Sequence, residues 1–371
     1  MKVLEKLAKH KNVLISGAPA TGKTFLLQQV ARAFLDPAFL TSPSPKPAVS
    51  LKSPFPIVPG GPAGAVQSIC PAPSRTDRKI FSTAFHQTYH PREFLNGLRP
   101  DVAKPGGFVV VQGKLFAASE HARTAKGASL LIVDELNRGP AVRIFGGAIA
   151  AIEGDKRLAE DGTDAQSVSF EITNPLDGKN LDYRLPAHLY ILAAMNKADV
   201  SVEPLDVAFL RRWTPYDLRP EEKTLRKLIG VEFAGELPAI PTEPAHVLEA
   251  LIRAWAGMNQ VIAKAKGRDY ELGHGSITGS RKDTMEHALR DAVEGWERIY
   301  QHVSEIFFGD ARALAAVFRA EGKNSVGFAV HEEEFADEFI TTFEAPAKVD
   351  ETTIYPLLLH VAANGTAKKA D

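Results

Sequence analysis

Gly17-Ala18-Pro19-Ala20-Thr21-Gly22-Lys23-Thr24 is the stretch that decides the fold of the first half of this chain. It follows the apolar run Val13-Leu14-Ile15 and precedes a segment, 25–35, whose apolar residues recur at helical spacing. The pattern G-x-x-x-x-G-K-[ST] between a strand and a helix predicts an anion site, because loop amides and the helix N-terminus face the same phosphates. We expect Lys23 to reach the β- and γ-phosphates and the Thr24 hydroxyl to hold Mg²⁺. The alternative is a plain glycine turn before a core helix.

Length, charge and cysteine content set bounds on the class of protein. The chain has 371 residues, enough for two domains, and 44 basic against 45 acidic side chains give a formal net charge of -1. No global excess of positive charge indicates nucleic-acid binding. The single cysteine, Cys70, excludes an internal disulfide and favours a reducing, cytoplasmic setting. No export signal and no run of about 18 apolar residues is found in the sequence, so we expect no membrane association.

A second apolar run ends in two carboxylates. Residues 129–133, Ser-Leu-Leu-Ile-Val, have the length and composition of a buried parallel strand, and Asp134-Glu135 follow directly. Ligand groups belong at the carboxyl edge of such a sheet. We expect Asp134 to organise Mg²⁺ with its water shell and Glu135 to polarise the attacking water. The alternative is that the two acids only cap the next helix.

A third buried-strand pattern covers residues 188–194 and ends at Asn196. An amide delivered there would lie beside the phosphates and orient the water, although an Asn at a strand end is also a common turn residue. Residues 206–213 then read as a helical turn with Arg211 and Arg212 near its end. Taken alone, this pair is most simply a helix C-terminus that complements the macrodipole.

The remaining segments complete the predicted organisation. Residues 36–79 break periodicity and are rich in proline, so we expect either a solvated or disordered excursion or a loop that contacts a partner or substrate. Beyond Leu218 the strands largely stop, which predicts an α/β domain over 1–218 and a helical domain over 219–371. Further predicted elements are a strand over 80–85, a short helix beginning at Pro91, a hairpin over 108–116, a helix over 139–152, a hairpin about Asp177-Gly178, and helices over 247–265, 283–308, 311–319 and 351–363.

Together these motifs resemble the McrB-type AAA+ NTPases, the motor subunits of methylation-dependent restriction systems. The resemblance covers roughly residues 10–220 in order and spacing, and Leu272 to Ser276 is similar to the family's entry into the lid domain. It is carried by Gly17 to Thr24, Phe85-His86-Gln87-Thr88-Tyr89, Phe94 to Pro100, Leu131 to Arg138, Met195-Asn196-Lys197-Ala198-Asp199, and Leu205 to Ala208 with Arg211-Arg212.

The resemblance implies a fold and an assembly. It implies a five-stranded parallel sheet with helices on both faces, followed by a helical lid, in a hexameric ring. It gives Arg211 and Arg212 the role of arginine fingers that reach the γ-phosphate bound by a neighbouring subunit. Asn196 becomes the sensor of the γ-phosphate and Glu135 the catalytic carboxylate. The nucleotide-binding set is then Gly17, Ala18, Pro19, Ala20, Thr21, Gly22, Lys23, Thr24, Phe25, Asp134, Asp199 and, from the lid, Arg281.

The chain departs from the family pattern at three positions. Lys197 stands where the family typically has Thr, Val200 where it has Arg, and Leu210 replaces the first of three successive arginines. The restriction member of the family uses GTP, and the altered segment after Asn196 belongs to its nucleotide site. Because ATP is the commoner choice among AAA+ proteins, we expect ATP in preference to GTP, with Mg²⁺.

The family context also predicts partners. We expect the motor subunit of an McrBC-like restriction or anti-phage defence complex, with a separate McrC-like nuclease or effector. The phosphate loop begins at residue 17, which leaves no room before it for a DNA-reading domain, so DNA would be reached only through the complex. The alternatives are a MoxR-like AAA+ chaperone that remodels protein partners, and a nucleotide-gated binding module without turnover. The Phe85-His86-Gln87 segment favours the restriction branch.

Overall fold

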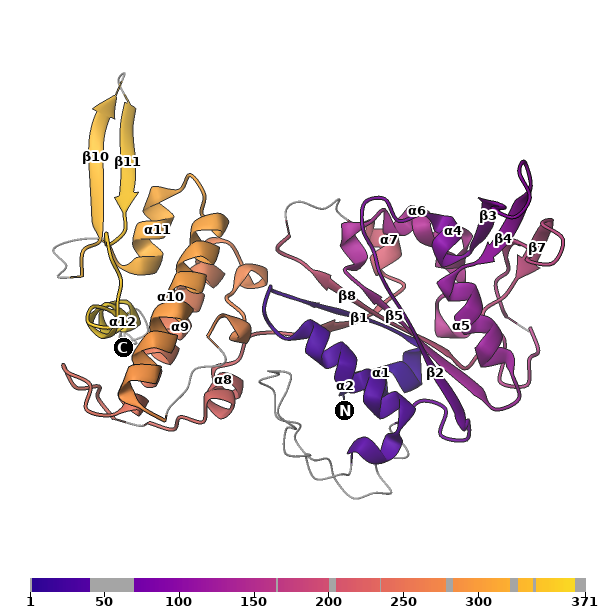
Figure 1. Cartoon of the computed structure of the whole chain (residues 1–371), viewed down its shortest axis with the longest axis horizontal. Helices are drawn as coiled ribbons and strands as arrows, with labels where there is room; N and C mark the ends of the chain where they lie inside the picture. Colours follow the sequence, from indigo (N-terminus) through magenta and orange to yellow (C-terminus); the bar gives the residue numbers. More distant parts are fainter. Residues whose placement is uncertain are drawn as a thin grey trace. The chain divides into compact units, whose positions relative to one another are not determined.

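A computed structural model of the chain describes residues 2–40, 70–164, 166–199, 205–233, 235–277, 283–320, 326–335 and 338–363 (Figure 1). These residues form two compact units. The first is built from the residues up to Gly17 and from Lys23 to Leu218, and the second from Ala18–Gly22 and from Arg219 onward. The tip of the glycine-rich loop is thus counted with the second unit, while the strand and helix that flank it belong to the first.

The first unit is organised around a five-stranded sheet in which every pair of neighbouring strands is parallel. Its order is β2-β5-β8-β1-β9, so the strand that enters the glycine-rich loop has neighbours on both sides. This confirms the predicted fold class, a five-stranded parallel sheet flanked by helices. The strands are β1 (Asn12–Gly17), β2 (Asp77–Ala84), β5 (Gly127–Asp134), β8 (Leu189–Asn196) and β9 (Thr214–Asp217).

Helices cover both faces of this sheet, which explains why its central strands read as continuous apolar runs. Alternate residues of β1 face opposite layers: Val13 and Ile15 pack with α1 (Lys2–His10) and α2 (Lys23–Leu35), whereas Leu14 packs on the other side. That other layer contains α5 (Lys114–Arg123), α6 (Ala141–Phe145) and α7 (Val207–Leu210) (Figure 1). The sheet is therefore a buried, rigid platform for the residues at its carboxyl edge.

The prediction of a hairpin over 108–116 was wrong in its pairing. Residues 108–112 do form a strand, β4 (Phe108–Gln112), but its antiparallel partner is β3 (Asn96–Pro100), which lies earlier in the chain. Leu115 and Phe116 instead belong to helix α5. Gly113 caps α5 where an added Cβ would lie 2.0 Å from the Leu95 carbonyl oxygen, so the turn is set by tertiary packing. The helix predicted at Pro91 is a short one, α4 (Pro91–Phe94).

A predicted hairpin and a predicted helix of the first unit can be compared with the structure. The hairpin about Asp177-Gly178 is confirmed as β6 (Phe170–Thr173) paired with β7 (Asn180–Tyr183). The single helix predicted over 139–152 is instead broken into α6 and a 3₁₀ segment, Gly146–Ala151. The break falls at Gly146, whose φ of 50° is a left-handed conformation that cannot continue an α-helix.

The second unit is mainly helical and also contains a hairpin that was not predicted. Its largest core lies between α9, α10 and α12, with Leu251, Trp296 and Leu358 fully or almost fully buried. The hairpin pairs two seven-residue strands that lack alternating apolar residues. The proline-rich segment is outside the described residues over 41–69, as is Arg281. The elements are α8 (Glu222–Ile229), α9 (Pro244–Ala265), α10 (Met285–Ile306), α11 (Ala311–Phe318), β10 (Ala329–Phe335), β11 (Glu338–Glu344) and α12 (Ile354–Ala362).

Candidate nucleotide site

Three predicted site residues lie at adjacent strand ends of the sheet. Gly17, the last residue of β1, is in register with Asn196, the last residue of β8. Asp134 is the last residue of β5, and β8 lies between β5 and β1 in the sheet. Because all three strands are parallel, their carboxyl ends meet at one edge. The structure thus places the start of the phosphate loop, one carboxylate and one amide on the same edge, as their positions after apolar runs predicted.

Lys23 is the first residue of α2, two residues earlier than the predicted helix start, and its Nζ donates to the Gly17 carbonyl oxygen at 3.0 Å. Burial lowers the pKa of Lys23 to about 8, although the carboxylates of Glu135 and Asp134 act in the opposite direction. A bound anion would stabilise the charged form of this desolvated lysine, as the two carboxylates already do in part. Lys23 is therefore suited to bind a phosphate group. Thr24 is exposed one residue further on, and Phe25 is half-buried.

The loop between β1 and α2 has a specific backbone conformation. Ala20 has a φ of 58° and Gly22 a φ of 91°, both in the left-handed region. The Thr21 hydroxyl donates to the Ala18 carbonyl oxygen at 2.8 Å and closes the loop on itself. Pro19 precedes this turn and removes one backbone donor from it. These residues, Ala18 to Gly22, form the part of the loop that is counted with the second unit.

Glu135 lies in a polar network at the end of β5. Its φ and ψ are 51° and 44°, a left-handed conformation that is uncommon for a residue with a side chain. Its Oε2 lies 3.5 Å from the Asn196 Nδ2 and 3.1 Å from the Arg138 Nε. Arg138 Nη2 in turn lies 3.4 Å from the Asp199 Oδ2. The two predicted residues Glu135 and Asn196 are therefore in contact, and Asp199 joins them through an arginine.

Sequence reasoning assigned no role to Arg138 or Asn137. Asn137 Nδ2 donates to the backbone carbonyl of Asn196 at 2.8 Å, which ties the turn after β5 to the end of β8. Both residues lie on the 3₁₀ turn Leu136–Arg138. The signal that could have found them is their place directly after an acidic pair at the carboxyl edge of the sheet.

The two arginines after α7 differ in their surroundings. Arg212 Nη1 donates to the Ala208 carbonyl, and its Nε lies 3.5 Å from the Glu153 Oε1. Arg211 is exposed, and its side chain makes no hydrogen bond or ion pair with the described residues. Within the described part of one chain, neither guanidinium is bonded to Lys23, Glu135 or the other site residues.

The donor set at the sheet edge fits Mg²⁺. Asp134 accepts a hydrogen bond from the Glu135 N–H at 2.9 Å through Oδ1, while Oδ2 receives none from the described residues. Over those residues no cluster of three or more His, Cys, Asp or Glu side chains could hold an ion unaided. Magnesium in phosphate sites typically takes one or two protein oxygens plus phosphates and water. Asp134 and the Thr24 hydroxyl would hold it, and it would supply charge neutralisation between phosphate oxygens.

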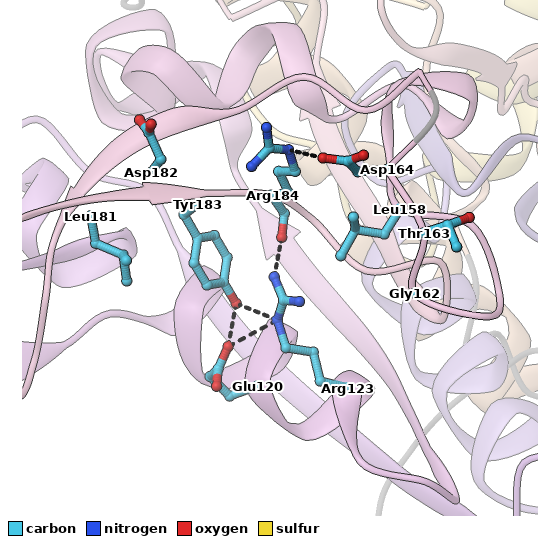
Figure 2. Close-up of a pocket in the computed structure, with 10 residues that line it drawn as sticks. All are labelled: Glu120, Arg123, Leu158, Gly162, Thr163, Asp164, Leu181, Asp182, Tyr183 and Arg184. Carbon is cyan, nitrogen blue, oxygen red and sulfur yellow. Dashed lines mark hydrogen bonds and ion pairs between the residues drawn. The ribbon is translucent and has the colours of Figure 1, made fainter.

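A separate cavity of about 660 Å³ lies in the first unit beside α5, β7 and residues 158–164 (Figure 2). Its arginines already face acids: Arg123 Nε lies 3.0 Å from the Glu120 Oε1, and Arg184 Nε 3.5 Å from the Asp164 Oδ2. The Tyr183 hydroxyl donates to Glu120 at 2.6 Å, and burial raises the pKa of Tyr183. None of the predicted site residues lines this cavity. With its cations neutralised, it does not fit a phosphate group.

The chain is similar to an AAA domain family and to two restriction-system proteins. The AAA domain of the dynein-related subfamily matches residues 66–213. The Type IV methyl-directed restriction enzyme EcoKMcrB subunit of Escherichia coli K12 is 25% identical over 292 residues, which cover 76% of this chain and 52% of that protein. These similarities support an McrB-type AAA+ NTPase. An AAA domain in general implies binding and hydrolysis of a nucleoside triphosphate.

A second relative also belongs to a restriction system. The Type II restriction enzyme BsuMI component YdiS of Bacillus subtilis 168 is 30% identical over 218 residues, covering 55% of this chain and 56% of that protein. The chain thus spans about half the length of both curated relatives. The match to a solved structure of a candidate ATPase from Cytophaga hutchinsonii covers 82% of this chain and 78% of that chain. The identity is 12% and the TM-score is 0.33. Over the described residues, no helix combines the length and the apolar character needed to cross a membrane.

Proposed function

We propose that this McrB-type chain is a Mg²⁺-dependent NTPase that works as an oligomeric ring, as the motor subunit of a restriction or anti-phage defence complex. The observation that carries the proposal is the convergence of Lys23, Asp134, Glu135 and Asn196 at the carboxyl edge of one sheet. A cation, a magnesium ligand, a carboxylate and an amide are the groups that phosphoryl transfer to water requires.

Each group has a role that follows from its chemistry. Lys23 neutralises charge on the β- and γ-phosphates, and the loop amides from Gly17 to Thr24 bind phosphate oxygens. Glu135 polarises the attacking water, and Asn196, in contact with Glu135, orients that water against the γ-phosphate. Asp199 acts through Arg138, which faces both carboxylates. Phe25 and Arg281, which lies outside the described residues, complete the proposed nucleotide-binding set.

Arg211 is the better candidate for a finger that acts on a neighbouring subunit. It is exposed and free of ion pairs with the described residues, whereas Arg212 is paired with Glu153. An arginine in trans stabilises the charge of the transition state and makes hydrolysis conditional on assembly. Turnover per chain should therefore rise steeply with protein concentration until the ring is complete. Turnover that is constant in a protein shown to be monomeric would contradict a trans role.

Base preference is tested in the same assay. We propose ATP in preference to GTP, because ATP is the commoner choice among AAA+ proteins and because Lys197 and Val200 alter the segment after Asn196. In this segment Lys197 Nζ lies 3.5 Å from the Asp217 Oδ1. Turnover of ATP and GTP measured at equal concentrations, with and without Mg²⁺, decides both the preference and the metal requirement. A faster turnover of GTP would overturn the preference and leave the NTPase proposal standing.

Substitution of Glu135 by Gln separates an enzyme from a nucleotide-gated binding module. The change preserves size and hydrogen bonding, so nucleotide affinity should stay within about twofold while turnover falls about a hundredfold or more. Affinity is measured with mant-labelled nucleotides and turnover by phosphate release. Asp182→Asn, at an exposed position of strand β7, is the matched control. Unchanged turnover in Glu135→Gln would favour the binding module.

The partner is a proposal that rests on the relatives. Both are named as parts of restriction enzymes, one as a subunit and one as a component. We propose a separate nuclease or effector subunit, with DNA contacted through the complex. A MoxR-like chaperone is the alternative, and the two restriction relatives favour the first reading. Identification of a nuclease encoded beside this chain, and its co-purification with it, would support the restriction complex; an adaptor for protein remodelling would support the alternative.

A further inference from the structure

Backbone of the second unit packs directly onto the tip of the phosphate loop. The Gly275 N–H donates to the Ala20 carbonyl oxygen at 2.8 Å. At Gly273 an added Cβ would lie 2.2 Å from the Ala20 carbonyl carbon and 2.3 Å from the Pro19 carbonyl oxygen. Real Cβ atoms do not approach backbone this closely, so only glycine allows the contact at position 273. The residues involved, Ala18–Gly22 and 272–276, belong to the same compact unit.

The segment 272–276, here called the clamp loop, is itself held by two buried polar side chains. Asn259 on α9 accepts from the Leu272 N–H at 2.6 Å and donates to its carbonyl oxygen at 3.1 Å. His274 is 2% exposed, and its Nε2 lies 2.7 Å from the backbone nitrogen of Glu221. Burial lowers the pKa of His274 and outweighs the backbone groups of Glu221 and Thr21, which act in the opposite direction. A neutral His274 therefore joins the clamp loop to the start of α8.

The tip of the phosphate loop needs such support. Ala20 has a φ of 58°, a left-handed conformation that is unfavourable for a residue with a Cβ. Strained backbone of this kind persists only where the surroundings determine it. The hydrogen bond from Gly275 and the close packing of Gly273 both act on Ala20, the strained residue. The clamp loop thus opposes relaxation of the loop that presents amide groups to phosphate.

We propose that the clamp loop is a positioning element for the phosphate loop, and that Asn259 and His274 are its positioning residues. The inference deepens the proposed function and rests on it. A phosphate loop that is already ordered does not lose conformational entropy when the ligand binds. The clamp loop therefore raises affinity for the triphosphate. The clamp loop takes no part in the bond-breaking step, which we assign to the residues at the sheet edge. The expected signature is a change in Kd and KM with little change in kcat.

Two substitutions test this from different directions. Gly273→Ala forces the clamp loop away from Ala20, and His274→Ala removes the bond to Glu221. Each should weaken binding of mant-ATP and mant-GTP by about tenfold and raise KM to match, with kcat within about threefold. His274→Gln keeps one polar group toward Glu221 and should recover part of the affinity. Gly275→Ala, whose added Cβ would lie 3.0 Å from the Ala20 oxygen, should have an intermediate effect and serves where Gly273→Ala fails to fold.

His246→Ala is the matched control. His246 is another buried histidine of the second unit, but it packs on Phe233 and pairs with Glu243. It should lower the melting temperature as much as His274→Ala and leave the nucleotide Kd within about twofold. The inference is overturned if the Gly273 and His274 variants bind nucleotide like the wild type, or if His246→Ala weakens binding equally. A wild-type chain that binds neither nucleotide would instead overturn the proposed function.

Discussion

At the scale of single residues, the site depends on a few side chains whose backbone or protonation is unusual. Glu135 has left-handed backbone, and its carboxylate lies between an amide and a guanidinium. Lys23 is desolvated enough for its pKa to fall to about 8. Strained and desolvated groups cost stability, and they gather where a ligand or a reaction uses them. A bound triphosphate would bring negative charge to Lys23, and Mg²⁺ would bring positive charge to the carboxylates.

Arg138 gives a first prediction at this scale. It lies 3.1 Å from Glu135 and 3.4 Å from Asp199, so its loss frees the carboxylate that polarises water. Arg138→Ala should lower kcat by about tenfold or more and leave KM within about twofold, because it disturbs positioning and not phosphate binding. Arg143→Ala, an exposed arginine on the neighbouring helix α6, is the control. An unchanged kcat in steady-state turnover would show that the contact is incidental.

His188 predicts a pH dependence of stability. It is 5% exposed, neither ring nitrogen has a hydrogen-bond partner in the described structure, and burial lowers its pKa below the ordinary 6.5. Below pH 6.5 the unfolded chain takes up a proton that the folded chain resists, so the free energy of unfolding falls as pH falls. Urea midpoints at pH 7.5 and 5.5 should differ less in His188→Leu than in the wild type. If His90→Leu, at an exposed position, reduced the difference equally, His188 would not be the cause.

At the scale of elements, the short helix α7 positions the proposed finger. Phe209 anchors it, with ring centroids 5.4 Å from Phe145 and 5.8 Å from Trp213. Asp206 caps its N-terminus by accepting from the Ala208 N–H at 2.8 Å. Arg211 follows directly after the last turn. A helix of four residues has little stability of its own, so cap and anchor decide whether Arg211 is held in place.

The cap can be removed without touching the arginine. Asp206→Ala should cost about 1 kcal/mol of local stability and lower turnover several-fold at protein concentrations where the wild type is fully assembled. Asp206→Asn keeps an acceptor of the same shape and should retain both. Stability is followed by hydrogen exchange of residues 207–213, and activity by phosphate release. Equal turnover in the two variants would contradict a positioning role for α7.

The elements also show what sequence alone can predict. β5 and β8 were predicted because strands buried on both faces are continuous apolar runs, and such strands place their ends at one edge. The pairing of β4 was wrong because its partner β3 is fixed by packing of Gly113 against Leu95, a contact between residues far apart in the chain. The hairpin β10–β11 was missed because β10 contains three successive glutamates, Glu332 to Glu334, and glutamate is uncommon in strands. Arg138 was missed because its role is visible only in its distances to two carboxylates.

At the scale of the whole molecule, the phosphate loop belongs to both compact units. Its ends, Gly17 and Lys23, belong to the sheet unit, while Ala18–Gly22 are counted with the helical unit. The site at the sheet edge supplies a lysine, carboxylates and an amide, and the exposed Arg211 is not bonded to them within the described chain. One chain therefore carries both halves of the proposed catalytic unit, and two neighbouring chains are needed to bring them together.

Mixing two inactive variants tests this central claim most directly. Glu135→Gln lacks the catalytic carboxylate but keeps Arg211, and Arg211→Ala keeps the carboxylate but lacks the finger. In a ring of randomly mixed subunits at equal amounts, about a quarter of sites would pair an intact Glu135 with a neighbour's intact Arg211. We predict that each variant alone is nearly inactive and that the mixture recovers about a quarter of wild-type turnover. A mixture no more active than the sum of the separate variants would contradict the account.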